Sequence, residues 1–294
     1  MTEPSPIDPP GPERLWGLRK GPLLMVVAGL SFTLMVSFVK VARAELSTLD
    51  VIFWRGVVSL PLIVGMASRV PWRPHRPWLL ALRASLGFSA MLCYFYAAKG
   101  LAITDQTLLG KLQPIVIAAL APLLLGRSER SGAWGWVIIA MGLVGSAILI
   151  APELQVGSLF GVAALAATVF SGLAHLCIRQ LTATDKPLVI VLWFQVFISV
   201  VSGAALVATS GLHWPELHLW APLAGVGICA VAGQMFMTYA YRADSASVVA
   251  TAGYTTPIWA VCIDLVIWGV IPGWNAILGG AIVVTAGLFL IARK

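Results

Sequence analysis

Charged residues are scarce in this chain. They make up 11% of its 294 residues, whereas hydrophobic residues make up 59%. Soluble domains carry about 25% charged residues, so a soluble protein is excluded. The alternating pattern of membrane β-strands is also missing. Long apolar runs fill the chain instead, and a helix needs only ~20 apolar residues to cross a bilayer. We predict an all-α membrane protein with ten transmembrane helices, at residues 22–42, 50–68, 77–99, 105–125, 131–151, 157–180, 187–210, 219–242, 246–270 and 274–292.

Motifs for catalysis, metal binding and nucleotide binding are missing as well. The four cysteines fall inside the apolar runs without Cys-x-x-Cys spacing, so we interpret them as packing residues. Neither His-Glu-x-x-His nor the phosphate-binding Gly-x4-Gly-Lys-Ser/Thr motif occurs. We therefore expect no enzyme, no metal, no cofactor and no direct coupling to ATP. A membrane-embedded enzyme or a non-transporting scaffold stays as a remote alternative.

The N-terminal segment 1–21 is polar and rich in proline. It has no apolar core followed by a small-residue cleavage site, so it does not have the pattern of a signal peptide. We predict a disordered cytoplasmic tail.

The net charge of +7 is distributed unevenly between the predicted loops. Ten spans put both termini on one side, and the loops there hold thirteen basic residues against three on the other side. Basic loops face the cytoplasm, so both termini should be cytoplasmic in a bacterial inner membrane. The charge is a topology signal, and we expect no nucleic-acid partner. The three basic residues of the opposite side are Lys40, Arg43 and Lys99.

The chain contains a duplicated segment. "GKLQPIVIAALAPLLLG" (110–126) and "GYTTPIWAVCIDLVIWG" (253–269) share the frame Gly-x3-Pro-Ile-x10-Gly. A shift of 139 residues also pairs Trp54 with Trp193. These matches predict two five-helix repeats, 22–151 and 157–292. Five is odd, so the second repeat is inverted in the membrane, which is a transporter architecture suited to alternating access.

With these features the chain resembles the EamA-type branch of the drug/metabolite transporter superfamily over essentially its whole length. Its tryptophans and tyrosines are most similar to those of YddG-like aromatic amino acid exporters. The resemblance implies export of small metabolites, with spans 5 and 10 at one edge and a possible homodimer through them. Glycines on these spans suit either a dimer contact or packing within the chain. Family members often place Glu directly after the glycine that ends span 4. Here Arg127 stands there and Glu129 follows late.

Four ionisable residues lie well inside the spans, where a charge costs ~2.5–3.5 kcal/mol at a helix centre. Arg83 is expected to snorkel to the nearby boundary. Arg55 could snorkel or face a cavity. Lys111 and Asp264 lie at a similar depth, ~9 Å from the same boundary. We hypothesise that they pair, directly or through water, on the outer side of the cavity. The alternative is that each snorkels or faces a separate water-filled crevice.

Two prolines interrupt the repeat-related spans. Pro114 frees the carbonyl of Gly110, and Pro257 frees that of Gly253, because proline has no N–H to donate. Such breaks at matching positions point to the binding site of a transporter. Kinks that serve packing alone are the alternative.

The remaining candidates are aromatic or polar residues that could line a cavity: Trp54, Tyr94, Gln113, His175, Trp193, Tyr239 and Tyr254. An aromatic and mildly polar cavity with one acid and one or two bases suits a zwitterion with an apolar side chain. We therefore expect export of aromatic or hydrophobic amino acids. Cationic drugs and nucleobase-like metabolites are the alternative substrates.

Overall fold

The computed structural model describes residues 13–15, 18–97, 100–101, 103–150, 159–209, 211–269 and 271–292. In these residues ten helices or helix pairs are long and apolar enough to cross a membrane, which confirms the predicted fold class. Residues 1–12 of the predicted tail, Lys99, Arg293 and Lys294 lie outside the described residues. The elements are β1 Arg14–Leu15, β2 Leu18–Arg19, α1 Lys20–Ala42, α2 Thr48–Ala67, α3 Pro77–Ala97, α4 Ile103–Gly110, α5 Gln113–Leu124, η1 Arg127–Glu129, α6 Ala133–Ile150, α7 Leu159–Leu181, α8 Pro187–Thr209, η2 Leu217–Leu219, α9 Trp220–Ala243, α10 Ala246–Ala252, η3 Gly253–Thr255, α11 Thr256–Trp268 and α12 Trp274–Ala292.

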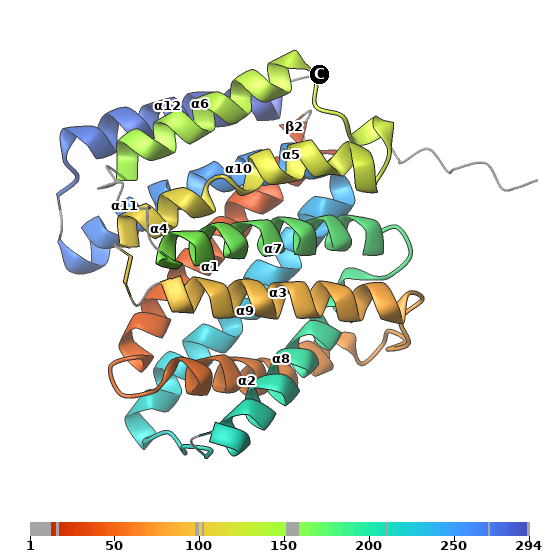
Figure 1. The fold of residues 1–294 in the computed structure, drawn as a ribbon, viewed down its shortest axis with the longest axis vertical. Coiled ribbons are helices and arrows are strands. Elements are labelled where there is room, and N and C mark those ends of the chain that lie inside the picture. Colours follow the sequence, from red (N-terminus) through yellow and green to blue (C-terminus); the bar gives the residue numbers. More distant parts are fainter. Residues whose placement is uncertain are drawn as a thin grey trace, which may run out of the picture.

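The packing of the helices follows the duplication. Helix α1 packs on α9, and its repeat counterpart α7 packs on α3. The helices α2 and α8 pack on each other, as do α5 and α10, and α6 and α12. Each of these pairs joins one repeat to the other, so the two repeats interlock throughout (Figure 1). The interior between them is therefore built from both halves of the chain.

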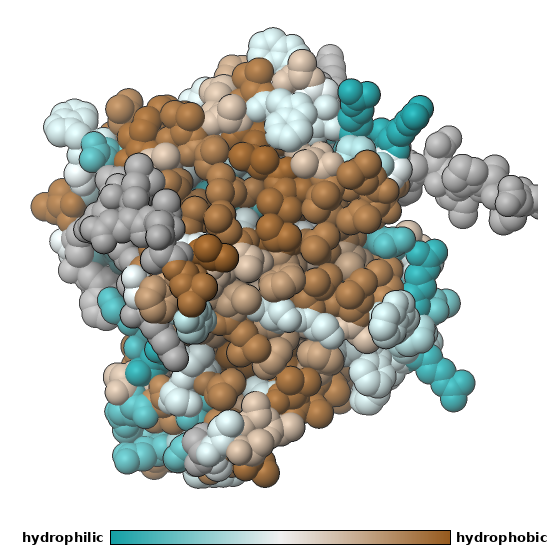
Figure 2. Space-filling model, viewed as in Figure 1, coloured by the Kyte–Doolittle hydropathy of each residue, from teal (hydrophilic) through white to brown (hydrophobic). Residues whose placement is uncertain are grey.

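The surface has an apolar middle and polar rims. Figure 2 shows hydrophobic side chains across the centre of this view and hydrophilic ones gathered at its left and right edges. Because most helices run from left to right in the same view, the apolar band covers their middle sections on this side of the molecule. We call the end formed by β2 and the connections 126–132, 182–186 and 243–245 the termini face. The connections 43–47, 211–219 and 269–273 form the opposite face.

The chain just before α1 is structured, although the sequence placed it in the disordered tail. Strands β1 and β2 pair as a short antiparallel hairpin. The backbone N–H of Glu13 donates to the carbonyl of Ala243, and Arg19 forms an ion pair with Asp244. These contacts attach the described end of the predicted tail to the connection between α9 and α10.

The glycines of spans 5 and 10 serve contacts within the chain. A Cβ on Gly145 would lie 2.9 Å from a methyl group of Ile282, and one on Gly279 would meet the backbone of α6. Close approach of α6 and α12 therefore requires both glycines. The homodimer stays a prediction, and it would have to use the outer faces of these helices.

The glycines that end the duplicated frame share a backbone conformation. Gly126 has a φ of 103° and Gly269 a φ of 65°. Positive φ is strained for residues with a Cβ, and this explains why both copies of the frame end in glycine.

We expect Gly126→Ala and Gly269→Ala each to lower the free energy of unfolding by about 1 kcal/mol, because alanine resists positive φ. The measurement is thermal unfolding in detergent. Gly132→Ala and Gly273→Ala are matched controls, since both sites are open and have ordinary φ. Equal melting temperatures for all four variants would contradict this explanation.

Candidate functional site

Both repeat-related spans are interrupted at the predicted residues. Helix α4 ends at Gly110 and α5 begins at Gln113, with Pro114 in its first turn. In the second repeat α10 ends at Ala252, a 3-10 turn covers 253–255, and α11 follows with Pro257 in its first turn. Helices α5 and α10 pack together. The two interruptions thus lie in adjoining spans from different repeats.

Lys111 joins the two interruptions. Its ammonium donates a hydrogen bond to the carbonyl oxygen of Gly253, with 3.2 Å between Nζ and O. This is the carbonyl that Pro257 leaves without its usual helical N–H donor. The same carbonyl also accepts from the hydroxyl of Thr256 at 2.8 Å and from the backbone N–H of Thr256, so Lys111 adds a contact from the other repeat.

The hypothesised pairing of Lys111 with Asp264 is wrong for this conformation. Asp264 lies on α11 and is exposed, whereas Lys111 is half-buried and bonded to Gly253. The two side chains therefore have different surroundings. The 3-10 turn explains this, because each of its residues advances the helix by about 120° instead of about 100°. The direction of Asp264 then differs from that expected of an uninterrupted helix.

A polar cluster lies beside the break of the first repeat. Gln113 donates to the hydroxyl of Ser171 at 2.7 Å and to Nδ1 of His175 at 2.9 Å. The hydroxyl of Tyr241 lies 3.1 Å from the same nitrogen. Gln113 comes from the first repeat and its partners from the second. This cluster brings together two of the predicted candidates, Gln113 and His175, and adds Tyr241, which is completely buried.

The two predicted tryptophans make hydrogen bonds to loops. Trp54 is buried among Phe53, Trp214 and Trp220, and its indole N–H donates to the carbonyl of His213 at 3.1 Å. Trp193 is 38% exposed.

The indole of Trp193 donates to the carbonyl of Trp72 at 2.8 Å. Each of the two repeat-related tryptophans therefore binds the loop that follows its counterpart's helix: Trp54 binds the loop after α8, and Trp193 the loop after α2. Their duplication reflects a shared structural contact.

We expect Trp54→Phe and Trp193→Phe to lower the free energy of unfolding by about 1 kcal/mol each, since each loses one hydrogen bond and little apolar area. Thermal unfolding in detergent measures the change. Trp78→Phe is the control, because Trp78 is 79% exposed. A loss as large for Trp78 as for the other two would contradict the assigned role.

The tyrosine candidates separate into two groups. Tyr94 and Tyr239 are exposed at about two-fifths of their surface. Tyr254, the counterpart of Lys111, is buried with its ring against Gly142, and its hydroxyl has no hydrogen-bond partner. Of the three, only Tyr254 belongs to the interior.

Arg83 does not snorkel. It is 2% exposed, its Nη2 donates to Oε1 of Gln234 at 2.8 Å, and its guanidinium carbon lies 3.6 Å from the ring centre of Phe194. Arg55 is 7% exposed and reaches the sulfur of Met91 at 3.9 Å. Depth alone misled the prediction, because a cation can turn inward when another helix offers a ring face and an amide oxygen.

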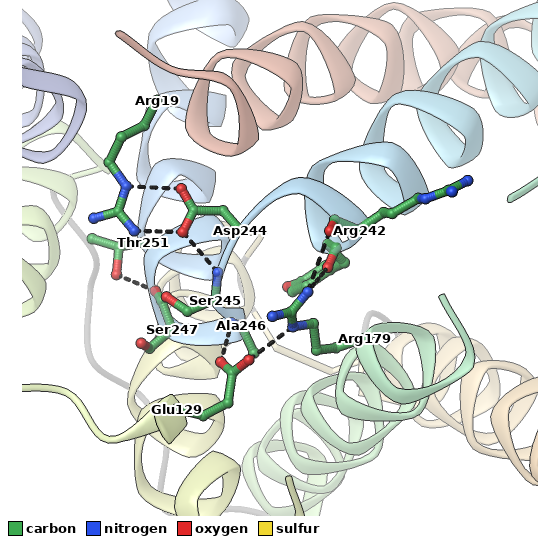
Figure 3. Close-up of polar contacts among 10 residues, drawn as sticks. Arg19, Glu129, Arg179, Arg242, Asp244, Ser245, Ala246, Ser247 and Thr251 are labelled. Carbon is green, nitrogen blue, oxygen red and sulfur yellow. Dashed lines mark hydrogen bonds and ion pairs between the residues drawn. The ribbon is translucent and has the colours of Figure 1, made fainter. Parts of the chain in front are cut away.

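Sequence reasoning also missed a polar network on the termini face. Glu129 is buried, accepts a 2.8 Å bond from Nε of Arg179, and accepts another at 2.7 Å from the backbone N–H of Ala246 (Figure 3). Arg179 also donates at 2.9 Å to the carbonyl of Tyr241. The contacts join the ends of α7 and α9 to the start of α10. The signal was present in the sequence: an acid soon after the glycine that ends span 4.

A second ion pair closes the same face. Nε of Arg19 donates to a carboxylate oxygen of Asp244 at 2.8 Å, and Nη2 binds the other oxygen. The backbone N–H of Ser245 also donates to this carboxylate. Both ion pairs are largely buried. Figure 3 shows that they lie between the ends of helices. In this conformation polar contacts therefore join the helix ends at the termini face.

The chain matches known transporters over nearly its whole length. Residues 19–151 and 159–293 each match the EamA-like transporter family. The pseudopaline exporter CntI of Pseudomonas aeruginosa is 29% identical, with 94% of this chain and 98% of the relative covered. A riboflavin transporter of Rhizobium johnstonii is 25% identical, with coverages of 93% and 91%.

A solved crystal structure has the same fold. Its TM-score is 0.76 at 17% identity, and it covers 91% of this chain and 95% of its own. Neither named relative is described as an aromatic amino acid exporter, so the finer resemblance to YddG-like proteins stays a prediction. The two matches to the family model coincide with the two halves of the interlocked bundle. The chain therefore belongs to the EamA-like transporter family and is a multi-pass membrane transporter.

Proposed function

We propose that this transporter exports small amino acid-like metabolites by alternating access. The observation that carries the proposal is the polar interior at the two helix breaks. Lys111 of one repeat reaches the carbonyl of Gly253 in the other, and Gln113 reaches Ser171 and His175 in the same way. A metabolite with an ammonium and a carboxylate could replace these bonds as the repeats move, because its ammonium would meet the acceptors and its carboxylate the donors.

The direction of transport follows from the proposed topology. The excess of basic residues in the loops of the termini face supports a cytoplasmic location of that face in a bacterial inner membrane. We infer that the pairs Arg19–Asp244 and Glu129–Arg179 hold the termini face closed, and that the structure represents the conformation from which a substrate leaves the cell.

Alternative substrates have unequal support. The buried cations Arg55 and Arg83 disfavour a cationic drug, because like charges repel in a medium of low dielectric. A nucleobase-like or other heteroaromatic metabolite keeps some support, since a riboflavin transporter is among the relatives.

Counterflow in proteoliposomes tests the proposal. Vesicles loaded with an unlabelled amino acid should accumulate the labelled form, whereas vesicles loaded with a cationic amine should not. Gln113→Leu should lower the initial rate at least tenfold, because it removes the bonds to Ser171 and His175. Thr285→Val is the control, since Thr285 is exposed and its hydroxyl bonds only within its own helix. Absence of counterflow for every amino acid tested would refute the proposed function.

A further inference from the structure

Two buried arginines of the first repeat have no acidic partner among the described residues. Arg55 lies on α2 and Arg83 on α3, and both are more than nine-tenths buried. Nε of Arg55 and both Nε and Nη1 of Arg83 have no hydrogen-bond partner. An unpaired buried charge is costly, because it loses its hydration without gaining a counter-ion. A stable fold alone gives no reason for two such cations.

The groups around the two arginines leave their N–H donors available. Arg83 uses one nitrogen on Gln234 and stacks on Phe194, while the nearest partner of Arg55 is a methionine sulfur. Gln195 follows Phe194 on α8; its amide is completely buried, and neither its nitrogen nor its oxygen has a partner. The unused donors are thus Nε of Arg55, Nε and Nη1 of Arg83 and the amide nitrogen of Gln195, and the amide oxygen of Gln195 is an acceptor without a donor. Arg55 and Arg83 come from the first repeat, and Phe194, Gln195 and Gln234 from the second.

The buried acids of the described chain lie elsewhere. They all occur at the ends of spans or in the connections between them, and none forms an ion pair with Arg55 or Arg83: Asp50, Asp105, Glu129, Asp185 and Asp244. Asp264, the acid expected in the cavity, is exposed on α11. The charge of this interior region is therefore positive, contrary to the nearly neutral cavity that the sequence suggested.

We propose that Arg55, Arg83 and Gln195 form an anion subsite between the repeats, and that the exported metabolite is acidic and carries carboxylates. This inference rests on the proposed function and names its substrate class. Guanidinium groups bind carboxylates through parallel N–H···O bonds, which suits Arg83, whose Nε and Nη1 are both unused. Arg55 and Arg83 come from two neighbouring helices of the first repeat, α2 and α3. Two buried cations suit a metabolite with two carboxylates better than a neutral zwitterion.

L-Glutamate and L-glutamine are suitable probes, because they differ by one carboxylate and otherwise have nearly the same shape. Binding to the purified transporter is measured by the shift of its melting temperature with ligand concentration. L-Glutamate should bind at least tenfold more tightly than L-glutamine. Arg55→Gln and Arg83→Gln should each weaken L-glutamate binding roughly tenfold to a hundredfold. Arg69→Gln is the control, since Arg69 lies exposed in a loop.

Arg83→Met separates a binding role from a structural one. Methionine keeps an apolar stem like that of arginine and removes the unpaired charge, so the variant should melt at the same temperature as the parent or higher, while L-glutamate binding is lost. A lower melting temperature with unchanged binding would assign Arg83 to the fold and overturn the proposal. Equal affinity for the two probes would also overturn it.

Counterflow distinguishes a failure of the anion subsite from a failure of the proposed function. If Arg83→Met transports L-glutamine as well as the parent does and neither carries L-glutamate, the proposed function stands and the anion subsite fails. If the parent binds L-glutamate through the arginines but carries no amino acid, the subsite is real and the proposed function fails.

Discussion

Replacing Gly279 with valine should separate α6 from α12 and unfold this edge of the bundle. A Cβ at residue 279 would lie 2.5 Å from the carbonyl oxygen of Gly145 and closer still to the backbone nitrogen of Leu149. Both are backbone atoms of a regular helix, so they cannot move aside as a side chain could. We expect a loss of about 3 kcal/mol or more, at the upper end of the usual cost of overpacking.

The control lies on the same helix. Gly287→Val adds the same side chain at a position where a new Cβ meets no atom within 4 Å. Its free energy of unfolding should stay within about 0.5 kcal/mol of the parent value. Size-exclusion profiles after heating measure the fraction that remains folded for both variants. Similar melting curves for Gly279→Val and the parent would show that α6 and α12 can separate without cost.

Replacing Glu129 with alanine should open the termini face. The change leaves the guanidinium of Arg179 without its carboxylate and the N–H of Ala246 without an acceptor. Removing one member of a buried ion pair costs about 3–5 kcal/mol, because the remaining charge is left uncompensated. The cost falls on the closed conformation, so the population of molecules open at this face should rise.

Cysteine labelling measures this shift. Thr251→Cys, in a background without the four native cysteines, places a buried thiol on α10 one turn beyond Ser247 (Figure 3). A membrane-impermeant maleimide applied from the termini face should react at least tenfold faster when Glu129 is alanine. Glu45→Ala is the control, because Glu45 is exposed on the opposite face. Unchanged labelling in Glu129→Ala would mean that the ion pair does not hold this face closed.

The sequence predicted the fold and the breaks well, because apolar length, the duplicated frame and proline chemistry act locally. The side-chain directions were harder to predict. Arg83 was misplaced because distance to a boundary says nothing of Phe194 and Gln234, which tertiary packing brings to it. Trp54 and Trp193 occupy equivalent positions of the two repeats, and the structure shows that this equivalence reflects a hydrogen bond from each indole to a loop. Lys111 was placed at the right break, and its partner was missed because the 3-10 turn alters the phase of α11.

The ion pairs of the termini face have a consequence for the energies of the two conformations. If the repeats were identical, exchanging their shapes would give two states of equal free energy. The duplicated frame relates positions 143 residues apart, from Gly110 to Gly253, and this shift pairs Glu129 with Pro272 and Leu101 with Asp244. Pro272 and Leu101 carry no charge, so the opposite face cannot be closed by ion pairs equivalent to Glu129–Arg179 and Arg19–Asp244. The resting transporter should therefore populate the state closed at its termini face, and each return to the other state must first break Glu129–Arg179 and Arg19–Asp244.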